Sequence, residues 1–314
     1  MNLPMLKIGD LTPKFPIIQG GMAVRISTAN LAAAVAEEGG IGLIAGTGMT
    51  VEELKEEIRK ARELTKGIIG INVMFAVTEF ANLVKTAIAE GIDLVVSGAG
   101  YSRDMFTWGK EAGVPIVPMV SSARLAKLAE KMGAAAVVVE GREAGGHLGT
   151  DRSMREILPE VKAAVKIPVI AAGGIVDGED IVEVLRLGAD GVQMGTRFAA
   201  SKESNASDEF KQLYLESDSE DVVLVDSPVG LKGRGLRNSF YDKVTYGEGV
   251  KVVNCHNCLK HCSRRFCILD ALEKAQQGDM EKGLVFSGEF IHKIKEILSV
   301  KDIFKQLISY VEKA

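Results

Sequence analysis

Eight short apolar runs alternate with amphipathic helical stretches over the first 200 residues of the chain. Each run is almost continuously apolar, as expected of parallel strands that are buried on both faces. Eight β/α repeats of this length predict an α/β fold of the (β/α)8 or TIM barrel type. The expected strands are residues 15–19, 41–45, 68–73, 94–98, 115–120, 135–140, 168–173 and 191–195.

The stretches between these strands carry the signals of helix ends. Thr50 is followed three residues later by Glu53, a capping box that predicts the start of a helix over 50–64. Helical stretches repeatedly end in glycine, as in "EEGG", "AEG" and "KMG". An open doubly wound sheet is the alternative, but it usually carries GxGxxG after its first strand. Because "FPIIQGGMA" lacks that pattern, the sequence favours the closed barrel.

The regular alternation stops after residue 200. Residues 202 to about 250 are polar and weakly periodic, and all four cysteines follow between 255 and 267. The tail, residues 290–314, predicts one or two closing amphipathic helices. We therefore assign residues 1–200 to the barrel core and 201–314 to an elaborated last β/α unit of the same domain.

The composition excludes several classes of protein. Apolar residues make up 46% of the 314 residues and the net charge is −4, with a pI of about 5.8. Such a chain has no overall attraction to nucleic acid or to an anionic membrane. It shows no signal peptide and no apolar run near the roughly 18 to 20 residues of a membrane span. We expect a cytoplasmic protein with a small-molecule substrate, and a homodimer stays an open alternative.

Unusual residues follow the expected strands, where a barrel builds its active site. Gly20, Gly21 and Met22 come after the first strand, and Asn72 lies near the end of the third. Residues 140–149, "EGREAGGHLG", follow the sixth. The last two loops contain Gly173, Gly174, Gly195 and Thr196, whose backbone N–H groups can bind an anion. A helix starting near Asp177 would add its positive dipole end; glycines that only make tight turns are the alternative.

Several of these segments together resemble one enzyme family. "PIIQGGMA", "GINVM", "EGREAGGHLG", "PVIAAGGI" and "GADGVQMGTRFAASKES" are similar to the FMN-dependent nitronate monooxygenases and to their sister group, the second type of flavin-dependent enoyl-acyl-carrier-protein reductase. The resemblance spans roughly residues 4 to 205. It implies one non-covalent FMN, with its phosphate on the loops of Gly173, Gly174, Gly195 and Thr196. It also implies that the isoalloxazine ring lies near Gly21, Met22, Asn72 and Glu140.

His147 is the candidate catalytic residue. The family has its active-site histidine in the matching motif, and Gly145 and Gly146 let the backbone pass close to flavin or substrate. A neutral imidazole can take a proton from a carbon acid, because its ordinary pKa lies near working pH. The alternative is a loop histidine that only makes hydrogen bonds. Glu143 is interpreted as solvated or as a loop clamp.

The cysteines form the motif C-x2-C-x3-C-x4-C at Cys255, Cys258, Cys262 and Cys267. Four thiolates within thirteen residues can meet at one zinc ion or iron–sulfur cluster. Reduced thiols on a loop that shields the flavin are an equal alternative. The enoyl reductases of the family lack such a cluster, which weakens the transfer of their activity to this chain.

Three functions follow from these features. The first is FMN-dependent oxidation of nitronates or nitroalkanes with O2 to a carbonyl compound and nitrite. The second is NAD(P)H-dependent reduction of an enoyl thioester or a quinone at the same flavin site, which needs no Rossmann motif. The third is a barrel without redox chemistry that binds a phosphorylated metabolite.

Overall fold

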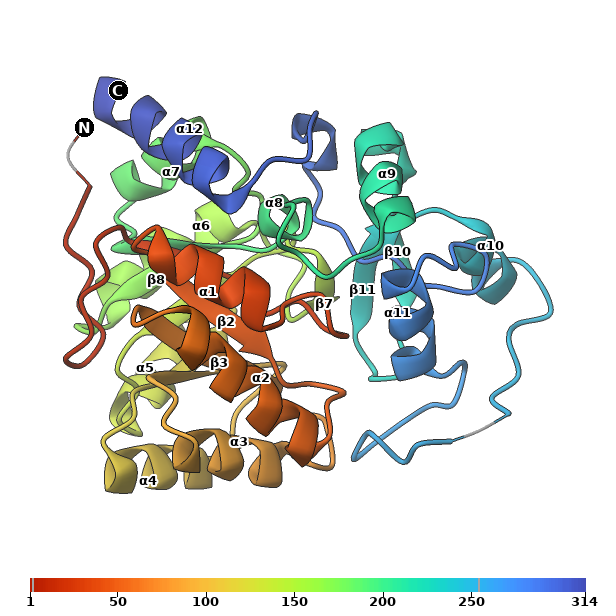
Figure 1. Cartoon of the computed structure of the whole chain (residues 1–314), viewed down its shortest axis with the longest axis horizontal. Helices are drawn as coiled ribbons and strands as arrows, with labels where there is room; N and C mark the ends of the chain where they lie inside the picture. Colours follow the sequence, from red (N-terminus) through yellow and green to blue (C-terminus); the bar gives the residue numbers. More distant parts are fainter. Residues whose placement is uncertain (2, 254) are drawn as a thin grey trace.

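A computed structural model describes residues 1, 3–253 and 255–314, and its centre is a closed barrel of eight parallel strands (Figure 1). The strand order is β1-β2-β3-β4-β5-β6-β8-β9. All eight strands expected from the apolar runs are present, so the predicted TIM barrel is confirmed. They are β1 (Ile17–Gln19), β2 (Ile41–Ala45), β3 (Ile68–Met74), β4 (Leu94–Gly98), β5 (Ile116–Val120), β6 (Val137–Glu140), β8 (Val169–Ala172) and β9 (Gly191–Met194).

The barrel strands are apolar throughout because both of their faces are buried. One face packs inside the barrel, where Ile18, Leu43 and Val138 belong to a fully buried cluster. The other face packs against the surrounding helices. Leu6 and Ile8 from the N-terminal segment join the inner cluster with no exposed surface. Burial on two sides leaves no alternation of polar and apolar residues, as the sequence pattern indicated.

A ring of helices surrounds the strands. The capping box at Thr50 is present, with Glu53 N donating to Thr50 Oγ1 over 3.1 Å. Gly39, Gly91 and Gly133, each just past a helix, have positive φ angles that favour glycine. The first seven helices are α1 (Ala29–Glu37), α2 (Val51–Leu64), α3 (Phe80–Ala89), α4 (Arg103–Ala112), α5 (Ala123–Lys131), α6 (Met154–Ala164) and α7 (Gly178–Arg186).

The eighth position in the ring is filled by the C-terminal helix α12 (Val300–Lys313), which packs against α7 and α1. Only the short helix α8 (Thr196–Ala199) follows β9 directly. The last β/α unit is therefore interrupted by residues 200–299, which we call the insertion. Of the two closing helices allowed for the tail, one is the α-helix α12 and the other is a single 3-10 turn, η2 (Ile291–Lys293).

The insertion contains more regular structure than its weak periodicity indicated. It forms α9 (Asp208–Glu216), η1 (Ser219–Asp221), β10 (Val222–Asp226), β11 (Lys232–Leu236), α10 (Ser239–Thr245) and α11 (Ile268–Gln276). These elements lie together beside the barrel (Figure 1, right). A small antiparallel sheet, β10-β11-β7, joins them to β7 (Gly146–Leu148), which follows β6. The sequence did not predict this sheet.

In the part of the chain that the structure describes, no helix is both long enough and apolar enough to span a bilayer.

Candidate active site

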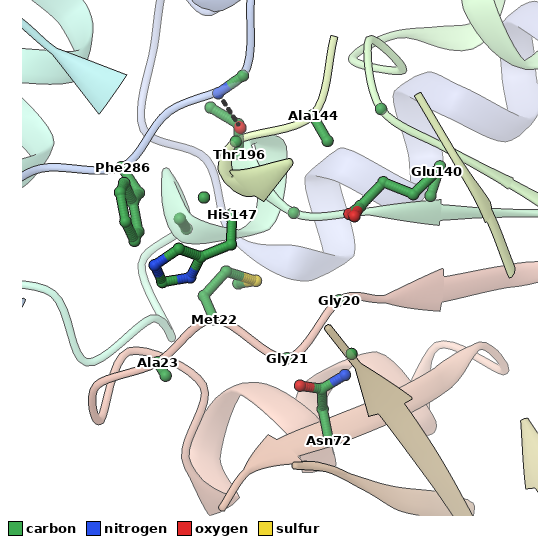
Figure 2. Close-up of a pocket in the computed structure, with 18 of the residues that line it drawn as sticks. Gly20, Gly21, Met22, Ala23, Asn72, Glu140, Ala144, His147, Thr196 and Phe286 are labelled. Atoms are coloured by element: carbon green, nitrogen blue, oxygen red, sulfur yellow. Dashed lines mark hydrogen bonds between the residues drawn. The ribbon is translucent and has the colours of Figure 1, made fainter. Parts of the chain in front are cut away.

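A cavity of about 230 Å³ lies at the carboxyl ends of the barrel strands, between the barrel and the insertion (Figure 2). All ten residues predicted to bind the cofactor or to act in catalysis line this one cavity. They are Gly21, Met22, Asn72, Glu140, Gly146, His147, Gly173, Gly174, Gly195 and Thr196. The structure therefore brings together residues up to 175 positions apart in the sequence, because they lie at the carboxyl ends of barrel strands or in the segments that follow them.

The loop after β1 is fixed by buried polar side chains. Gln19 is fully buried, accepts a hydrogen bond from Leu43 N over 3.0 Å and donates to Ser27 Oγ over 2.9 Å. Ser27 Oγ in turn accepts from Met22 N over 2.9 Å. Because these bonds tie both ends of the loop to the barrel, Gly20–Met22 hold a defined path along the cavity floor.

Gly21 is required by its neighbour Asn72. A Cβ atom at Gly21 would collide with the side chain of Asn72, which projects from β3 toward this loop (Figure 2). The bare backbone of Gly21 therefore lets the loop pass against the Asn72 amide. Both residues line the cavity.

The loops after β8 and β9 present free backbone donors. Gly173 and Gly174 have φ angles of +96° and +65°, which L-residues rarely adopt. Among the described residues, none accepts a hydrogen bond from the N–H groups of Gly173, Gly174 or Thr196. The Thr196 hydroxyl accepts from Gly288 N of the insertion over 3.0 Å. Unpaired N–H groups around a cavity are suited to an anion.

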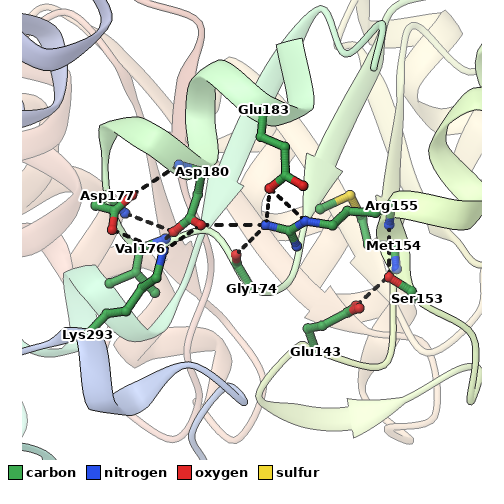
Figure 3. Close-up of polar contacts among 10 residues, drawn as sticks. All are labelled: Glu143, Ser153, Met154, Arg155, Gly174, Val176, Asp177, Asp180, Glu183 and Lys293. Carbon is green, nitrogen blue, oxygen red and sulfur yellow. Dashed lines mark hydrogen bonds and ion pairs between the residues drawn. The ribbon is translucent and has the colours of Figure 1, made fainter. Parts of the chain in front are cut away.

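The start of α7 does not add a free positive dipole end to this site. The Asp177 side chain accepts from Asp180 N over 3.0 Å, and Asp180 Oδ2 accepts from Val176 N over 2.9 Å. Lys293 of the insertion neutralises both carboxylates, at 3.1 Å and 2.7 Å (Figure 3). The helix thus starts at Asp177 as expected, and protein carboxylates already cap its positive end.

A second ion pair supports the glycine loop from outside. Arg155 of α6 pairs with Glu183 at 2.6 Å and donates to Gly174 O over 3.4 Å (Figure 3). Glu143 is buried and accepts from Met154 N over 2.9 Å. Of the two interpretations of Glu143, the structure shows the loop clamp.

Glu140 ends β6 with its carboxyl group in the cavity (Figure 2). Burial raises the pKa of this carboxyl to about 8, because removal from water disfavours the charged form. The group is therefore mostly neutral at pH 7 and can donate a hydrogen bond as well as accept one.

His147 lies in a strand, not in an irregular loop. It is the middle residue of β7 and pairs with Gly233 of β11. Its Nε2 lies 2.7 Å from Ser227 Oγ, and its ring packs edge-to-face on Phe286 with centroids 5.1 Å apart. Both preceding glycines are required, since Gly146 has φ +82° and a Cβ at Gly145 would lie 2.7 Å from the backbone of Ser287. The insertion thus fixes the orientation of this imidazole.

The environment of His147 also sets its charge. Burial lowers the pKa of the imidazole to about 4. The ring is therefore neutral at pH 7, with one nitrogen available to accept a proton. The same shift makes it a weaker base than an exposed histidine.

Several lining residues were not identified from the sequence. Gln193 on β9 is 7% exposed, and its Oε1 has no hydrogen-bond partner among the described residues. Its position two residues before Gly195 in "GVQMG" was the available signal, since a polar side chain interrupts an apolar strand. Further lining residues come from barrel loops, and the insertion contributes Tyr214, Leu259, Ile268, Leu269, Leu272, Phe286, Gly288, Phe290 and Ile291.

The cysteine segment, residues 255–267, adjoins this site. Its four cysteines are free thiols that line one second cavity of about 180 Å³. Within residues 1, 3–253 and 255–314, no three His, Cys, Asp or Glu side chains are arranged as a formed metal site. The structure therefore does not show the metal site that the cysteine spacing predicted as one alternative.

Comparison with known proteins agrees with this geometry. The nitronate monooxygenase family model matches residues 5–309. A Mycobacterium tuberculosis (3aS,4S,5R,7aS)-5-hydroxy-7a-methyl-1-oxo-octahydro-1H-indene-4-carboxyl-CoA dehydrogenase is 34% identical over 75% of this chain and 67% of its own. A probable nitronate monooxygenase of Staphylococcus aureus is 30% identical over 76% of this chain and 80% of its own.

Solved structures extend the comparison to nearly the whole chain. FabK from Thermotoga maritima has a TM-score of 0.87 and 34% identity, covering 96% of this chain and 94% of its own. Nitroalkane oxidase from Streptomyces ansochromogenes has a TM-score of 0.82 and 25% identity, covering 96% of both chains. The chain is an oxidoreductase that belongs to the nitronate monooxygenase family, a family of FMN-dependent flavoenzymes.

Proposed function

We propose that the cavity binds FMN with its phosphate on the backbone of Gly173, Gly174, Gly195 and Thr196. Unpaired N–H groups at three of these residues support this assignment. The flavin ring would then lie along Gly21, Met22 and Asn72, with Glu140 at its edge. The orphaned Oε1 of Gln193 supports the fit, because a buried acceptor in a cavity requires a donor from the bound group.

We further propose that the enzyme oxidises nitronates or nitroalkanes with O2 to a carbonyl compound and nitrite. FMN, when bound, would supply the electron acceptor that this oxidation needs. His147 carries the proposal, because it is a neutral imidazole in the cavity whose orientation is fixed by Ser227. The match of the family model over residues 5–309 supports the same reaction class.

The low pKa of His147 sharpens its role. A neutral imidazole that is protonated only near pH 4 can accept a proton from a neutral nitroalkane. Its driving force for this transfer is smaller than that of an ordinary histidine. We expect no loss of activity around pH 6.5, and a loss attributable to this group only toward pH 4. The same shift makes the fold less stable as pH falls from 6.5 toward 4, since the unfolded imidazole takes up its proton first.

His147→Asn tests this role. We expect retained FMN, because the phosphate loops are untouched, and turnover of neutral nitroalkane reduced by roughly 10²- to 10⁴-fold. Turnover of preformed nitronate should fall less, since its proton is already gone. Nitrite release and flavin content measure both effects. Equal losses on both substrates would leave His147 as a positioning residue, and unchanged rates would remove it from catalysis.

Reduction of an enoyl thioester by NAD(P)H is the second candidate. The apolar wall formed by Leu259, Leu269 and Leu272 supports it, because an acyl chain requires such a surface. The structural similarity to FabK supports it as well. Anaerobic stopped-flow reduction of the bound flavin by propionate 3-nitronate, NADH and NADPH separates the two functions. Fast bleaching by a nicotinamide with none by the nitronate would replace the first proposal with the second.

A further inference from the structure

The cysteine segment is anchored at both sides but has no regular structure between its anchors. Thr78 N donates to Cys258 O over 3.0 Å, and Lys260 N donates to Ala76 O over 2.9 Å. On the other side Arg265 pairs with Asp226 of β10 at 3.2 Å. The described residues from Cys255 to the start of α11 contain no helix or strand. Besides these contacts, the burial of Leu259 and Phe266 fixes the path of this segment.

The four thiols face a common space. Cys255, Cys258, Cys262 and Cys267 line one cavity together with apolar side chains that include Phe266. Four thiols around one cavity within thirteen residues match the ligand number of a tetrahedral zinc site or of a four-iron cluster. Cys255 and Cys262 are exposed and Cys258 and Cys267 are partly exposed, so a metal ion can reach all four residues from solvent.

The backbone repeats one geometry around two of the cysteines. Asn257, two residues after Cys255, has φ +49°, and Arg264, two residues after Cys262, has φ +57°. Asparagine adopts such left-handed angles readily, but for Arg264 they are unfavourable by about 1 kcal/mol or more. At the second turn Arg264 N donates to Cys262 Sγ over 3.4 Å. Hydrogen bonds from the protein to ligand sulfurs are a usual feature of thiolate metal centres.

The charges near the segment have the sign that thiolates require. Residues 249–269 include Lys251, Lys260, Arg264 and Arg265 but no Asp or Glu, and of these cations Arg265 is paired with Asp226 from outside the segment. A divalent metal held by four thiolates carries a net charge of −2, so surrounding cations stabilise it. Neutral thiols would gain nothing from this excess of positive charge.

We propose that Cys255, Cys258, Cys262 and Cys267 bind a metal centre through four thiolates. A single zinc ion and an iron–sulfur cluster share this ligand chemistry. Metal binding would draw the sulfurs inward and release the thiol protons to water, and the irregular backbone permits this movement without breaking a helix or strand. Leu259 and Ile268 line both this cavity and the candidate active site. The metal would thus also fix one wall of the active site.

The test begins with metal content and does not depend on activity. Protein is produced with added zinc and iron, purified without air, and assayed for zinc, iron and acid-labile sulfide, with its visible spectrum recorded. We expect about one zinc, or about four iron and four sulfide, per chain. The double variant Cys255→Ser/Cys262→Ser should lose this metal, whereas the neighbouring control Ser263→Ala should retain it.

Trypsin supplies a second readout, because it cleaves after Lys260, Arg264 and Arg265 within the segment. A bound metal should protect these bonds, so the double serine variant should be cut at least tenfold faster than the Ser263→Ala control. Less than one tenth of a metal per chain in anaerobic protein would overturn the proposal. So would two disulfides among the four cysteines, or full metal retention in the serine variant. None of these outcomes depends on the flavin or its substrate.

Discussion

The barrel and the insertion differ in what determines their structure. Each barrel strand is an apolar run whose burial on both faces follows from its own composition. The strands of the insertion are half-exposed, and Leu224 in β10 keeps 45% of its surface in contact with water. Local sequence is enough to specify the first kind of strand. The second kind depends on partners that are distant in the chain.

Strand β11 shows this dependence most clearly. Its sequence, "KGRGL", has low strand propensity because two of its five residues are glycine. Those glycines are required by packing, since a Cβ at Gly233 would lie 2.8 Å from the Phe286 ring and one at Gly235 would collide with Val285 O. The strand forms because β10 and β7 pair with it on both sides. The insertion, whose strands depend on distant partners, therefore positions the candidate catalytic residue His147.

Among the predictions that compare the barrel with the insertion, the largest effect lies in a barrel loop. Gly173→Ala should weaken FMN binding by about 10- to 100-fold, or about 1.4 to 2.8 kcal/mol. The added Cβ would lie 3.0 Å from Ala144 N, so the loop must move away from the phosphate position. Flavin content after dialysis and titration of the apoprotein with FMN measure the change.

Gly133→Ala is the matched control for this variant. Gly133 has the same φ of +96°, but no atom lies within 4 Å of the position of its added Cβ. Both variants should lose about 1 to 2 kcal/mol of stability through the left-handed backbone. Only Gly173→Ala should lose flavin. Equal flavin retention in the two proteins would exclude the Gly173 loop from the phosphate site.

The sequence was sufficient for the barrel because each of its signals is local. The apolar runs, the capping box at Thr50 and the glycines after helices all act within a few residues of the feature they specify. The helix α12 could be expected as amphipathic, but its place beside α7 and α1 depends on the length of the insertion. No local pattern records that kind of pairing.

The site residues that could be predicted belong to the barrel, and those that could not belong to the insertion. Gly21, Asn72 and Glu140 could be found because they lie at or just after the ends of predicted strands, which a barrel brings to one end. Phe286 and Tyr214 could not, because they reach the cavity through packing of the insertion. Their only sequence signal is hydrophobicity, which a core residue shares. The orientation of His147 was missed for the same reason, since Ser227 lies 80 residues away.

A smaller effect is expected where the insertion meets the barrel. Lys293→Met removes the cation between Asp177 and Asp180, and Asp180 is only 5% exposed. A half-buried ion pair of this kind should cost about 1 to 2 kcal/mol when broken, less than a fully buried one. Lys301→Met, an exposed change on α12, is the control and should cost little. Urea denaturation of both variants measures the difference, and equal stabilities would mean that Lys293 does not secure the insertion.

The smallest effect that we predict concerns two helix N-caps, one in the barrel and one in the insertion. Thr50 caps the 14-residue helix α2, whereas Asp218 caps the three-residue η1 through a bond from Glu220 N of 3.2 Å. Both side chains are exposed, so the change to alanine removes the cap without disturbing a core. Thr50→Ala should cost about 1 kcal/mol, and Asp218→Ala less than about 0.5 kcal/mol, because little helix depends on the second cap. Urea midpoints at constant slope measure both. A larger loss at Asp218 would show that local signals matter as much in the insertion as in the barrel.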